Sequence, residues 1–236
     1  PSISVSSISR GEMGHTPPES YNAFMVKACY YAMIELIDYQ LSRIVDVLQE
    51  TGQLDNTIII FTSDHGELLG DHGLIYKGCR FFESLVHVPL VISCPGMFKK
   101  NLRSEALVEL VDLAPTLLEA TGIKIPYYMQ GKSLLSLLKG RSSPNKHKMY
   151  IISEYNDALA LPDKTHGSMY FDGRYKIIIY HNHDVGELYD LETDPGEFNN
   201  LWELPDYREL KCTLMKKHFD AMMSTISAGI ERTGIY

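Results

Sequence analysis

The fold is decided by residues 57–67, which read Thr57-Ile58-Ile59-Ile60-Phe61-Thr62-Ser63-Asp64-His65-Gly66-Glu67. The first part of this stretch is a continuous apolar run, which is typical of a strand buried on both faces, as in a parallel sheet between helices. The polar residues that follow stand just beyond the end of that strand. Because ligands in open α/β sheets bind outside the carboxyl ends of the strands, the stretch predicts a buried strand with a site at its end.

The segments on either side of this strand favour an α/β sheet. Before it, apolar residues recur at three- and four-residue steps and predict one long helix, with Gly52 where a C-terminal cap belongs. After it, Val88 to Ser93 reads as a second buried strand, and Asp112 is placed to cap a helix that ends near Ala120. This order of elements predicts a mixed or parallel sheet flanked by helices. The apolar positions of the long helix are Tyr30, Met33, Ile34, Ile37, Leu41, Ile44, Val45 and Leu48.

Beyond about residue 145 the pattern changes to that of a small antiparallel subdomain. Asp172-Gly173 is a two-residue hairpin signal between two strands, and Glu187 to Asp190 reads as a further strand. Asp194-Pro195-Gly196 suits a type II turn. A last helix is expected from about Asp206 to Ser224, and strands followed by a helix indicate an α+β arrangement.

The composition excludes some classes of function. The chain has 236 residues, a formal net charge of -8 and a sequence pI near 5.6, which argues against a nucleic-acid surface. The basic stretch from Lys139 to Lys148 reads as a solvated loop, and no apolar run is long enough to span a bilayer. The four cysteines have no metal-binding spacing, so we expect buried apolar residues rather than a disulfide framework. The chain opens on Pro1 rather than on Met, so we expect that a targeting segment can precede it, and the compartment stays open.

Asp64, His65 and Lys77 are the candidate site residues. Adjacent side chains of a strand point to opposite faces, so Asp64 and His65 can act together only after the chain leaves the pleat, which Gly66 permits. A carboxylate and an imidazole at such a point are a plausible pair of ligands for a divalent metal. Lys77 would supply a compact positive charge for an anionic substrate. The alternative is a polar loop with a surface lysine, because short motifs match by chance.

A longer pattern surrounds these residues and resembles the sulfatases of the alkaline phosphatase superfamily, including the related phosphonate monoester hydrolases. Ile60 to Gly66 is followed by Gly70-Asp71-His72-Gly73 and by Lys77-Gly78, and the order and spacing agree from about residue 30 to residue 201. The later matching segments are Val88-Pro89-Leu90-Val91-Ile92 through Pro95-Gly96, Val111-Asp112-Leu113-Ala114-Pro115-Thr116-Leu117-Leu118, and Leu188-Tyr189-Asp190-Leu191-Glu192-Thr193-Asp194-Pro195-Gly196-Glu197-Phe198-Asn199-Asn200-Leu201.

The resemblance implies a role for each candidate residue. Asp64 and His65 match the family's late pair of metal ligands, which implies a divalent metal, calcium foremost, with manganese or magnesium as alternatives. Lys77 matches the catalytic, substrate-binding lysine that contacts the sulfate or phosphonate oxygens. Many sulfatases have Asn where His65 stands, and His is frequent in the branch that includes the phosphonate monoester hydrolases. The reaction class therefore stays open between sulfate and phosphonate or phosphate esters.

One part of the family pattern is missing. In the family a formylglycine nucleophile lies in a Cys/Ser-x-Pro-x-Arg motif before the metal loop, and none of the four cysteines begins such a motif. Ser142-Ser143-Pro144-Asn145-Lys146 comes closest, but it ends in Lys and follows the metal loop, so it reads as a loop. The family's early metal aspartates are missing too.

These observations predict the C-terminal portion of a sulfatase-type hydrolase. We expect residues 1–147 to be the C-terminal half of the α/β catalytic core and residues 148–236 to be the antiparallel C-terminal subdomain. The full-length parent would hydrolyse sulfate esters of a small molecule or glycan with a divalent metal, and the N-terminal portion of the same protein would be its partner. This chain alone would be inactive. The alternatives are a phosphonate or phosphate ester hydrolase of the same superfamily, or a non-catalytic fragment or binding module.

Overall fold

The computed structural model describes residues 21–156 and 165–226 and divides the chain into two compact units. The first unit is Pro1–Leu102 with Tyr155–His166, and the second is Arg103–Glu154 with Gly167–Tyr236. The boundary expected between residues 147 and 148 concerns the domains of a longer parent protein and stays a prediction.

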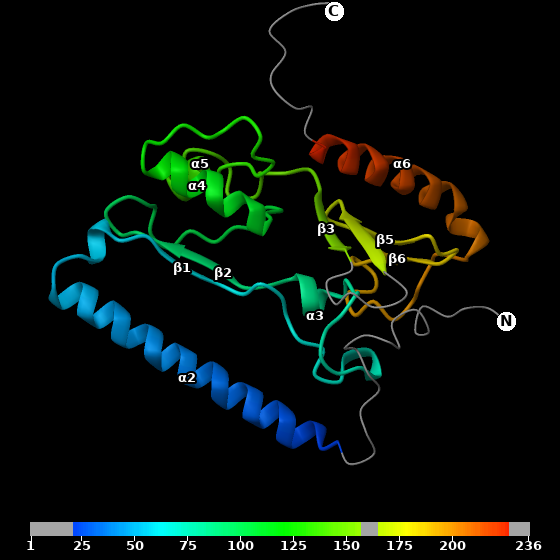
Figure 1. Cartoon of the computed structure of the whole chain (residues 1–236), viewed down its shortest axis with the longest axis horizontal. Helices are drawn as coiled ribbons and strands as arrows, with labels where there is room; N and C mark the ends of the chain where they lie inside the picture. The colour runs from blue at the N-terminus through cyan, green and yellow to red at the C-terminus, as the bar shows by residue number, and fades with distance from the viewer. Residues whose placement is uncertain (1–20, 157–164, 227–236) are drawn as a thin grey trace, which may run out of the picture. The chain divides into compact units, whose positions relative to one another are not determined.

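The first unit begins with the long helix that the apolar periodicity predicts. Helix α2 spans Ala23–Glu50, and the side chain of Asn22 caps its start by accepting a hydrogen bond from the backbone N–H of Met25 at 3.0 Å. Gly52 follows the end of the helix with a φ of +68°, the left-handed conformation that a C-terminal cap requires. The helix is drawn in blue in Figure 1, and none of its residues is buried within the described part of the chain.

The two predicted strands pair with each other, but in the antiparallel direction. Strand β1 (Ile59–Thr62) pairs with strand β2 (Leu90–Ser93), with Ile59 opposite Ser93. Of the expected mixed or parallel sheet, this pair therefore excludes the purely parallel alternative. The connection from residue 63 to residue 89 holds only short helical turns, whereas a parallel pair needs a crossover that carries the chain back to the starting edge. Those turns are η2 (Asp71–Gly73) and α3 (Glu83–Val86), and η1 (Leu54–Asn56) precedes β1.

In the second unit, the predicted helix is present but its predicted cap is wrong. Helix α4 spans Leu113–Ala120 after the turn η3 (Leu110–Asp112), and the side chain of Asp112 makes no capping hydrogen bond to α4. The Asp112 carboxylate instead accepts hydrogen bonds from the backbone N–H groups of Glu109, at 3.0 Å, and Lys132, at 2.7 Å. It therefore ties α4 to a distant loop. The short helix α5 (Leu135–Leu138) follows that loop.

Two composition-based expectations need correction. The stretch that ends at Lys148 is not a solvated loop throughout, because the Lys148 ammonium lies 2.7 Å from Asp112 Oδ1 and its side chain is mostly buried. All four cysteines are free, but only Cys79 and Cys94 are buried, whereas Cys29 and Cys212 are exposed. The two exposed cysteines lie on the outer surfaces of helices, where a small apolar residue needs no partner.

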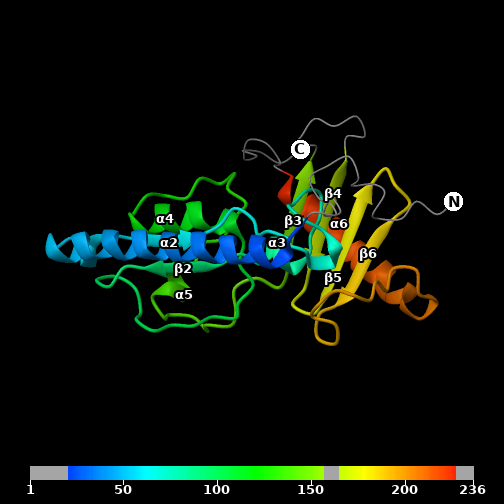
Figure 2. The same cartoon turned by 90° about the horizontal axis from the view of Figure 1, so that it is seen from below.

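The predicted antiparallel subdomain is a four-stranded sheet with a helix packed on it. Figure 2 shows strands β3 to β6 side by side, in the order β3-β4-β5-β6, and β5 pairs with β6 in the antiparallel direction. The turn η4 (Pro205–Tyr207) leads into helix α6 (Arg208–Thr225), which contacts β5. The strands are β3 (Ile151–Asn156), β4 (His166–Phe171), β5 (Tyr175–His181) and β6 (Gly186–Asp190). The core between sheet and helix is Tyr170, Ile177, Leu188, Leu201, Leu214 and Ala221.

The turn after β6 differs from the predicted type. The backbone N–H of Glu197 donates to the carbonyl of Asp194 at 3.1 Å, which closes a four-residue turn with Pro195 in its second position. Gly196 does not have the positive φ that a type II turn requires, whereas Glu197 has a φ of +57°. A Cβ at position 196 would lie 2.4 Å from the ring of Phe198, an exposed side chain that would have to turn away to make room.

Candidate metal and anion site

The loop that follows β1 is fastened to α3 through Gly66. The backbone N–H of Gly66 donates to the carbonyl of Leu85 at 2.8 Å. A Cβ at position 66 would lie 1.9 Å from the backbone oxygen of Ser84, so no residue larger than glycine fits there without moving the backbone. This close approach fixes where the preceding Asp64 and His65 stand relative to α3.

Asp64 and His65 face each other at the end of β1. The backbone N–H of His65 donates to Asp64 Oδ1 at 3.0 Å, and His65 Nε2 lies 3.5 Å from Asp64 Oδ2. That backbone hydrogen bond lowers the pKa of Asp64, and the Lys77 ammonium lowers it further. The carboxylate is therefore ionised at neutral pH and offers only acceptor oxygens.

The contacts of the His65 ring leave Nε2 as an acceptor. Its Nδ1 lies 2.8 Å from the carbonyl oxygen of Gly66, which can only accept, so Nδ1 carries the proton. The lone pair of Nε2 then faces the Lys77 ammonium at 2.9 Å and the Asp64 carboxylate. This tautomer, fixed by a backbone carbonyl, is the form in which histidine binds a metal.

Lys77 reaches this point because the loop between it and His65 folds back on itself. The backbone N–H of Leu68 donates to the carbonyl of Tyr76 at 3.0 Å, and that of Gly70 donates to the carbonyl of Leu74 at 2.7 Å. The chain thus returns beside its starting point one residue before Lys77. The structure therefore brings Asp64, His65 and Lys77 together.

Sequence reasoning missed two supporting contacts. The Ser63 hydroxyl donates to the backbone carbonyl of His65 at 2.7 Å, which holds the turn that brings His65 back toward Asp64. The His72 ring stacks on Phe82 with 3.7 Å between ring centroids and 10° between planes, which packs the far end of the loop against the start of α3. Ser63 stands inside the matching motif, but its hydrogen bond depends on a turn that no residue pattern specifies.

The donor set suits part of a divalent-metal site. An ionised carboxylate and an imidazole with a free lone pair are ligands that such ions accept, and the two groups converge here. Across residues 21–156 and 165–226, no three or more His, Cys, Asp or Glu side chains gather in a way that would hold a metal. Asp64 and His65 would therefore form one side of a coordination shell, and Lys77 would add a cation beside it.

The part of the chain that the structure describes contains no helix that is both long enough and apolar enough to cross a membrane.

Two protein-family models match the chain. The model described as "N-sulphoglucosamine sulphohydrolase, C-terminal" matches residues 70–224, and the model described as "Sulfatase" matches residues 12–123. The two matches overlap over residues 70–123, which include Lys77, whereas Asp64 and His65 lie in the second match alone.

Curated relatives are sulfatases, and each match covers about a third of the relative's length. Arylsulfatase K of Rattus norvegicus is 36% identical over 185 residues, which cover 75% of this chain and 32% of that protein. The N-acetylglucosamine-6-O-sulfatase of Bacteroides thetaiotaomicron is 33% identical over 190 residues, which cover 79% of this chain and 34% of that protein. The chain thus spans about a third of the length of the curated relatives that it matches.

Solved structures show the same fold. The phosphonate monoester hydrolase of Agrobacterium radiobacter matches with a TM-score of 0.78 and 29% identity, over 89% of this chain and 44% of that chain. A protein solved in complex with its substrate, D-glucosamine-2-N,6-O-disulfate, matches with a TM-score of 0.75 and 29% identity, over 87% of this chain and 42% of that chain.

Proposed function

Because the chain belongs to the sulfatase family of the alkaline phosphatase superfamily, we propose that its site serves the metal-dependent hydrolysis of sulfate esters by the full-length parent protein. The observation that carries this proposal is the convergence of the Asp64 carboxylate, the His65 Nε2 lone pair and the Lys77 ammonium beyond the end of β1. Metal ligands and a cation at one point are suited to binding and polarising an anionic ester group.

Each residue has a separate task in this proposal. Asp64 and His65 would hold a divalent ion, calcium foremost, and that ion would polarise the sulfate group when bound. The Gly66 carbonyl keeps the His65 proton on Nδ1, so that Nε2 stays available as a ligand. The Lys77 ammonium would stabilise the negative charge that grows on the sulfate oxygens during hydrolysis.

The nucleophile would come from elsewhere in the sulfatase polypeptide. No Cys/Ser-x-Pro-x-Arg motif occurs in the 236 residues, and the curated relatives extend over about three times the matched length. We propose that a formylglycine residue in the unmatched part completes the site, together with the remaining metal ligands. The relatives' names and the bound disulfated glucosamine of one structural neighbour favour a sulfated amino sugar or glycan as substrate.

A second candidate function is phosphonate or phosphate ester hydrolysis. It is favoured by the fold match to the phosphonate monoester hydrolase of Agrobacterium radiobacter, at a TM-score of 0.78, and by His65, which resembles that branch of the superfamily. The same cluster of ligands and cation suits both anions, because sulfate and phosphonate esters present similar oxygens.

A panel of substrates distinguishes sulfate ester hydrolysis from phosphonate or phosphate ester hydrolysis. The protein, expressed from its natural reading frame with whatever residues precede Pro1, would be assayed on glucosamine 6-sulfate, an aryl sulfate and an aryl phosphonate. We expect sulfate release to have the highest kcat/KM and to be lost with a metal chelator. A higher kcat/KM for the phosphonate would favour the second candidate, and turnover of none of the three would leave the chain a non-catalytic member of the family.

A further inference from the structure

Charge is unevenly distributed along this chain. Residues 120–153 contain six of its 22 Lys and Arg and none of its 30 Asp and Glu, so this segment has a formal charge of +6. Because the whole chain has a formal charge of -8, the remaining residues carry -14. At the average frequency of the chain, a segment of 34 residues would include about four carboxylates. The segment lies within the second unit, whereas Asp64, His65 and Lys77 belong to the first.

Two loops carry this charge, and a hydrogen bond joins them. Residues 121–134 connect α4 to α5, residues 139–150 connect α5 to β3, and the two are called here the basic loops. The Lys132 ammonium on the first loop donates to the backbone carbonyl of His147 on the second at 3.0 Å. This contact leaves the charge of Lys132 in place, because the acceptor is a neutral carbonyl. The basic loops are therefore in contact, and their charge is gathered in one part of the second unit.

Most of these cations face solvent without a counter-ion. Lys124, Arg141 and Lys146 are exposed, and among the described residues no carboxylate lies within ion-pair distance of them. Lys148 is the exception, since its side chain is mostly buried and its ammonium lies 2.7 Å from Asp112 Oδ1. Unpaired cations on a chain of net charge -8 attract a polyanion to one place, while the rest of the chain repels it.

A turn of the first basic loop adds two exposed aromatic rings. The backbone N–H of Met129 donates to the carbonyl of Pro126 at 3.1 Å, so Tyr127 and Tyr128 occupy the tip of that turn. The two tyrosines are 64% and 62% accessible, and their ring centroids lie 5.7 Å apart with 80° between the planes. The face of an aromatic ring attracts the polarised C–H bonds of a sugar, and the phenol hydroxyl forms hydrogen bonds with sugar substituents.

From these cations and aromatic rings together, we propose that the basic loops bind a sulfated glycan chain. Each sulfate group keeps a full negative charge at neutral pH, so successive sulfates pair with the cations of the two loops, and a sugar ring stacks on Tyr127 or Tyr128. Binding at this surface would raise the local concentration of a polymeric substrate around the protein. That the polyanion is a glycan rests on the proposed function, whereas the charge and exposure of the loops do not.

Binding of a heparin oligosaccharide tests the proposal without turnover, so this result and that of the substrate panel are independent. The polypeptide expressed from its natural reading frame would be titrated with the oligosaccharide in the presence of a metal chelator, which stops the proposed hydrolysis. We expect binding at 50 mM salt that weakens on the order of 50-fold at 200 mM salt, because four exposed cations release the counterions of the polyanion. No binding at the lower salt concentration would overturn the proposal, and so would tighter binding of a single-stranded oligodeoxynucleotide of equal charge.

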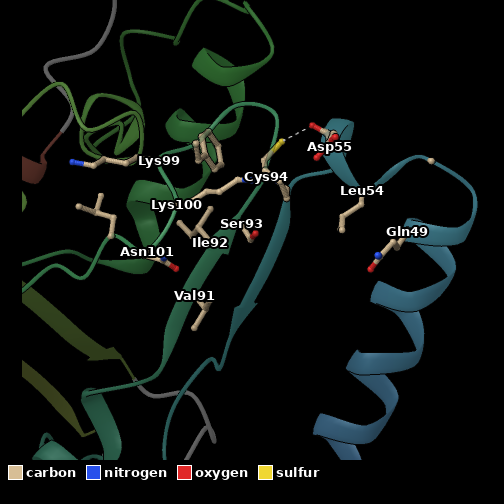
Figure 3. A pocket seen from close by; sticks show the side chains of 14 residues that line it. Gln49, Leu54, Asp55, Val91, Ile92, Ser93, Cys94, Lys99, Lys100 and Asn101 are labelled. Atoms are coloured by element: carbon tan, nitrogen blue, oxygen red, sulfur yellow. Dashed lines mark hydrogen bonds between the residues drawn. The ribbon is translucent and has the colours of Figure 1, made fainter.

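Paired charge reversals locate the contact. Lys124→Glu with Arg141→Glu should weaken heparin binding at least about tenfold and lower the slope of log affinity against log salt by about two. The matched control is Lys99→Glu with Lys100→Glu, which changes the net charge equally. These two exposed lysines line a groove of the first unit that Asp55 also lines (Figure 3). The control should bind almost as tightly as the wild type, and equal losses in the two pairs would overturn the proposal.

Tyr127→Ala with Tyr128→Ala tests the aromatic rings. Loss of both stacking faces should weaken heparin binding about five- to tenfold and leave the salt slope unchanged, because the rings carry no charge. If the charge-reversal pair does not yield folded protein, Lys124→Gln with Arg141→Gln should give a smaller loss in the same direction. Wild-type affinity in the tyrosine variant would overturn the assignment to a glycan, and wild-type affinity in the Lys124 and Arg141 variants would overturn the surface itself.

Discussion

At the scale of single residues, the site depends on where backbone atoms hold two side chains. Asp64 is kept ionised by the backbone N–H of His65, and His65 is kept in one tautomer by the carbonyl of Gly66. The motif predicts the residue types, but the tautomer follows only from the turn. Removal of the Asp64 side chain and removal of the Lys77 side chain should therefore impair catalysis in different ways.

Asp64→Ala in the full-length parent should weaken metal affinity, and excess metal should partly restore activity, because carboxylate ligands set the affinity for a hard divalent ion. Lys77→Ala should lower kcat/KM by about two to four orders of magnitude with little change in metal affinity, because it removes one preorganised cation. Metal titration and steady-state kinetics on both variants measure the metal affinity and kcat/KM. Wild-type kcat/KM in Lys77→Ala would make Lys77 an ordinary surface lysine.

Gly66→Ala should displace the loop, because the added Cβ would collide with the backbone oxygen of Ser84. Overpacking of this kind costs about 1–3 kcal/mol, so urea unfolding should show reduced stability and metal binding should weaken. Gly122→Ala is the control, since Gly122 has a positive φ but open space around its Cα. Its metal affinity should be unchanged, and unaltered metal binding in Gly66→Ala would contradict the anchoring role.

At the scale of elements, strand existence was predictable and strand direction was not. Residues 57–62 and 88–93 predict β1 and β2 to within two residues, because continuous apolar runs depend on local composition. Their antiparallel pairing depends on the connection between them, which lacks a crossover helix. Asp112 shows the same limit, since its carboxylate stands at the start of a helix but accepts a hydrogen bond from Lys132, 20 residues away in sequence.

The buried pair on β5 carries a prediction of its own. The Lys176 ammonium lies 2.7 Å from Glu197 Oε1, and both side chains are almost fully buried. Lys176→Met should destabilise the protein by about 3–5 kcal/mol, because removing one partner leaves a buried charge. The double variant with Glu197→Leu should lose less stability than the sum of the single variants, as a double-mutant cycle by denaturant unfolding would show. Additive losses would mean that the two charges act independently.

A histidine buried between helix α6 and its sheet lowers the stability of the folded protein at acidic pH. His218 is buried, neither ring nitrogen has a hydrogen-bond partner among the described residues, and burial, with a smaller contribution from His181, lowers its pKa to about 4. The unfolded chain binds this proton near pH 6.5 and the folded chain only near pH 4, so stability falls as the pH drops between these values. The loss should approach about 3 kcal/mol below pH 4.

His218→Leu should remove that part of the pH dependence. Unfolding midpoints measured from pH 7 to pH 4 would show a shallower decline in the variant than in the wild type. His183→Leu, at the tip between β5 and β6, is the matched control, because it makes the same substitution outside the core between the sheet and α6. An identical decline in wild type and His218→Leu would show that other groups cause it.

At the scale of the whole molecule, the chain holds one side of a site and lacks the nucleophile motif. The 236-residue chain alone should therefore turn over an aryl sulfate no faster than the same chain carrying Lys77→Ala does. The reason is that loss of a covalent nucleophile lowers the rate by many orders of magnitude. A sulfate-release assay on the purified chain measures this. Turnover at ordinary enzymatic rates would mean that another group in these residues attacks sulfur.

The exposed thiol of Cys29 has a chemical consequence. Cys29 is exposed on α2 and Cys212 is exposed on α6, whereas Cys79 and Cys94 are buried. The four thiols thus form a built-in labelling set. In the folded 236-residue chain an alkylating reagent should modify Cys29 and Cys212 alone, whereas unfolding should open Cys79 and Cys94 to the reagent as well. The ratio of the peptides modified at buried cysteines to those modified at exposed cysteines would report, in one mass spectrum, how much of a sample is unfolded.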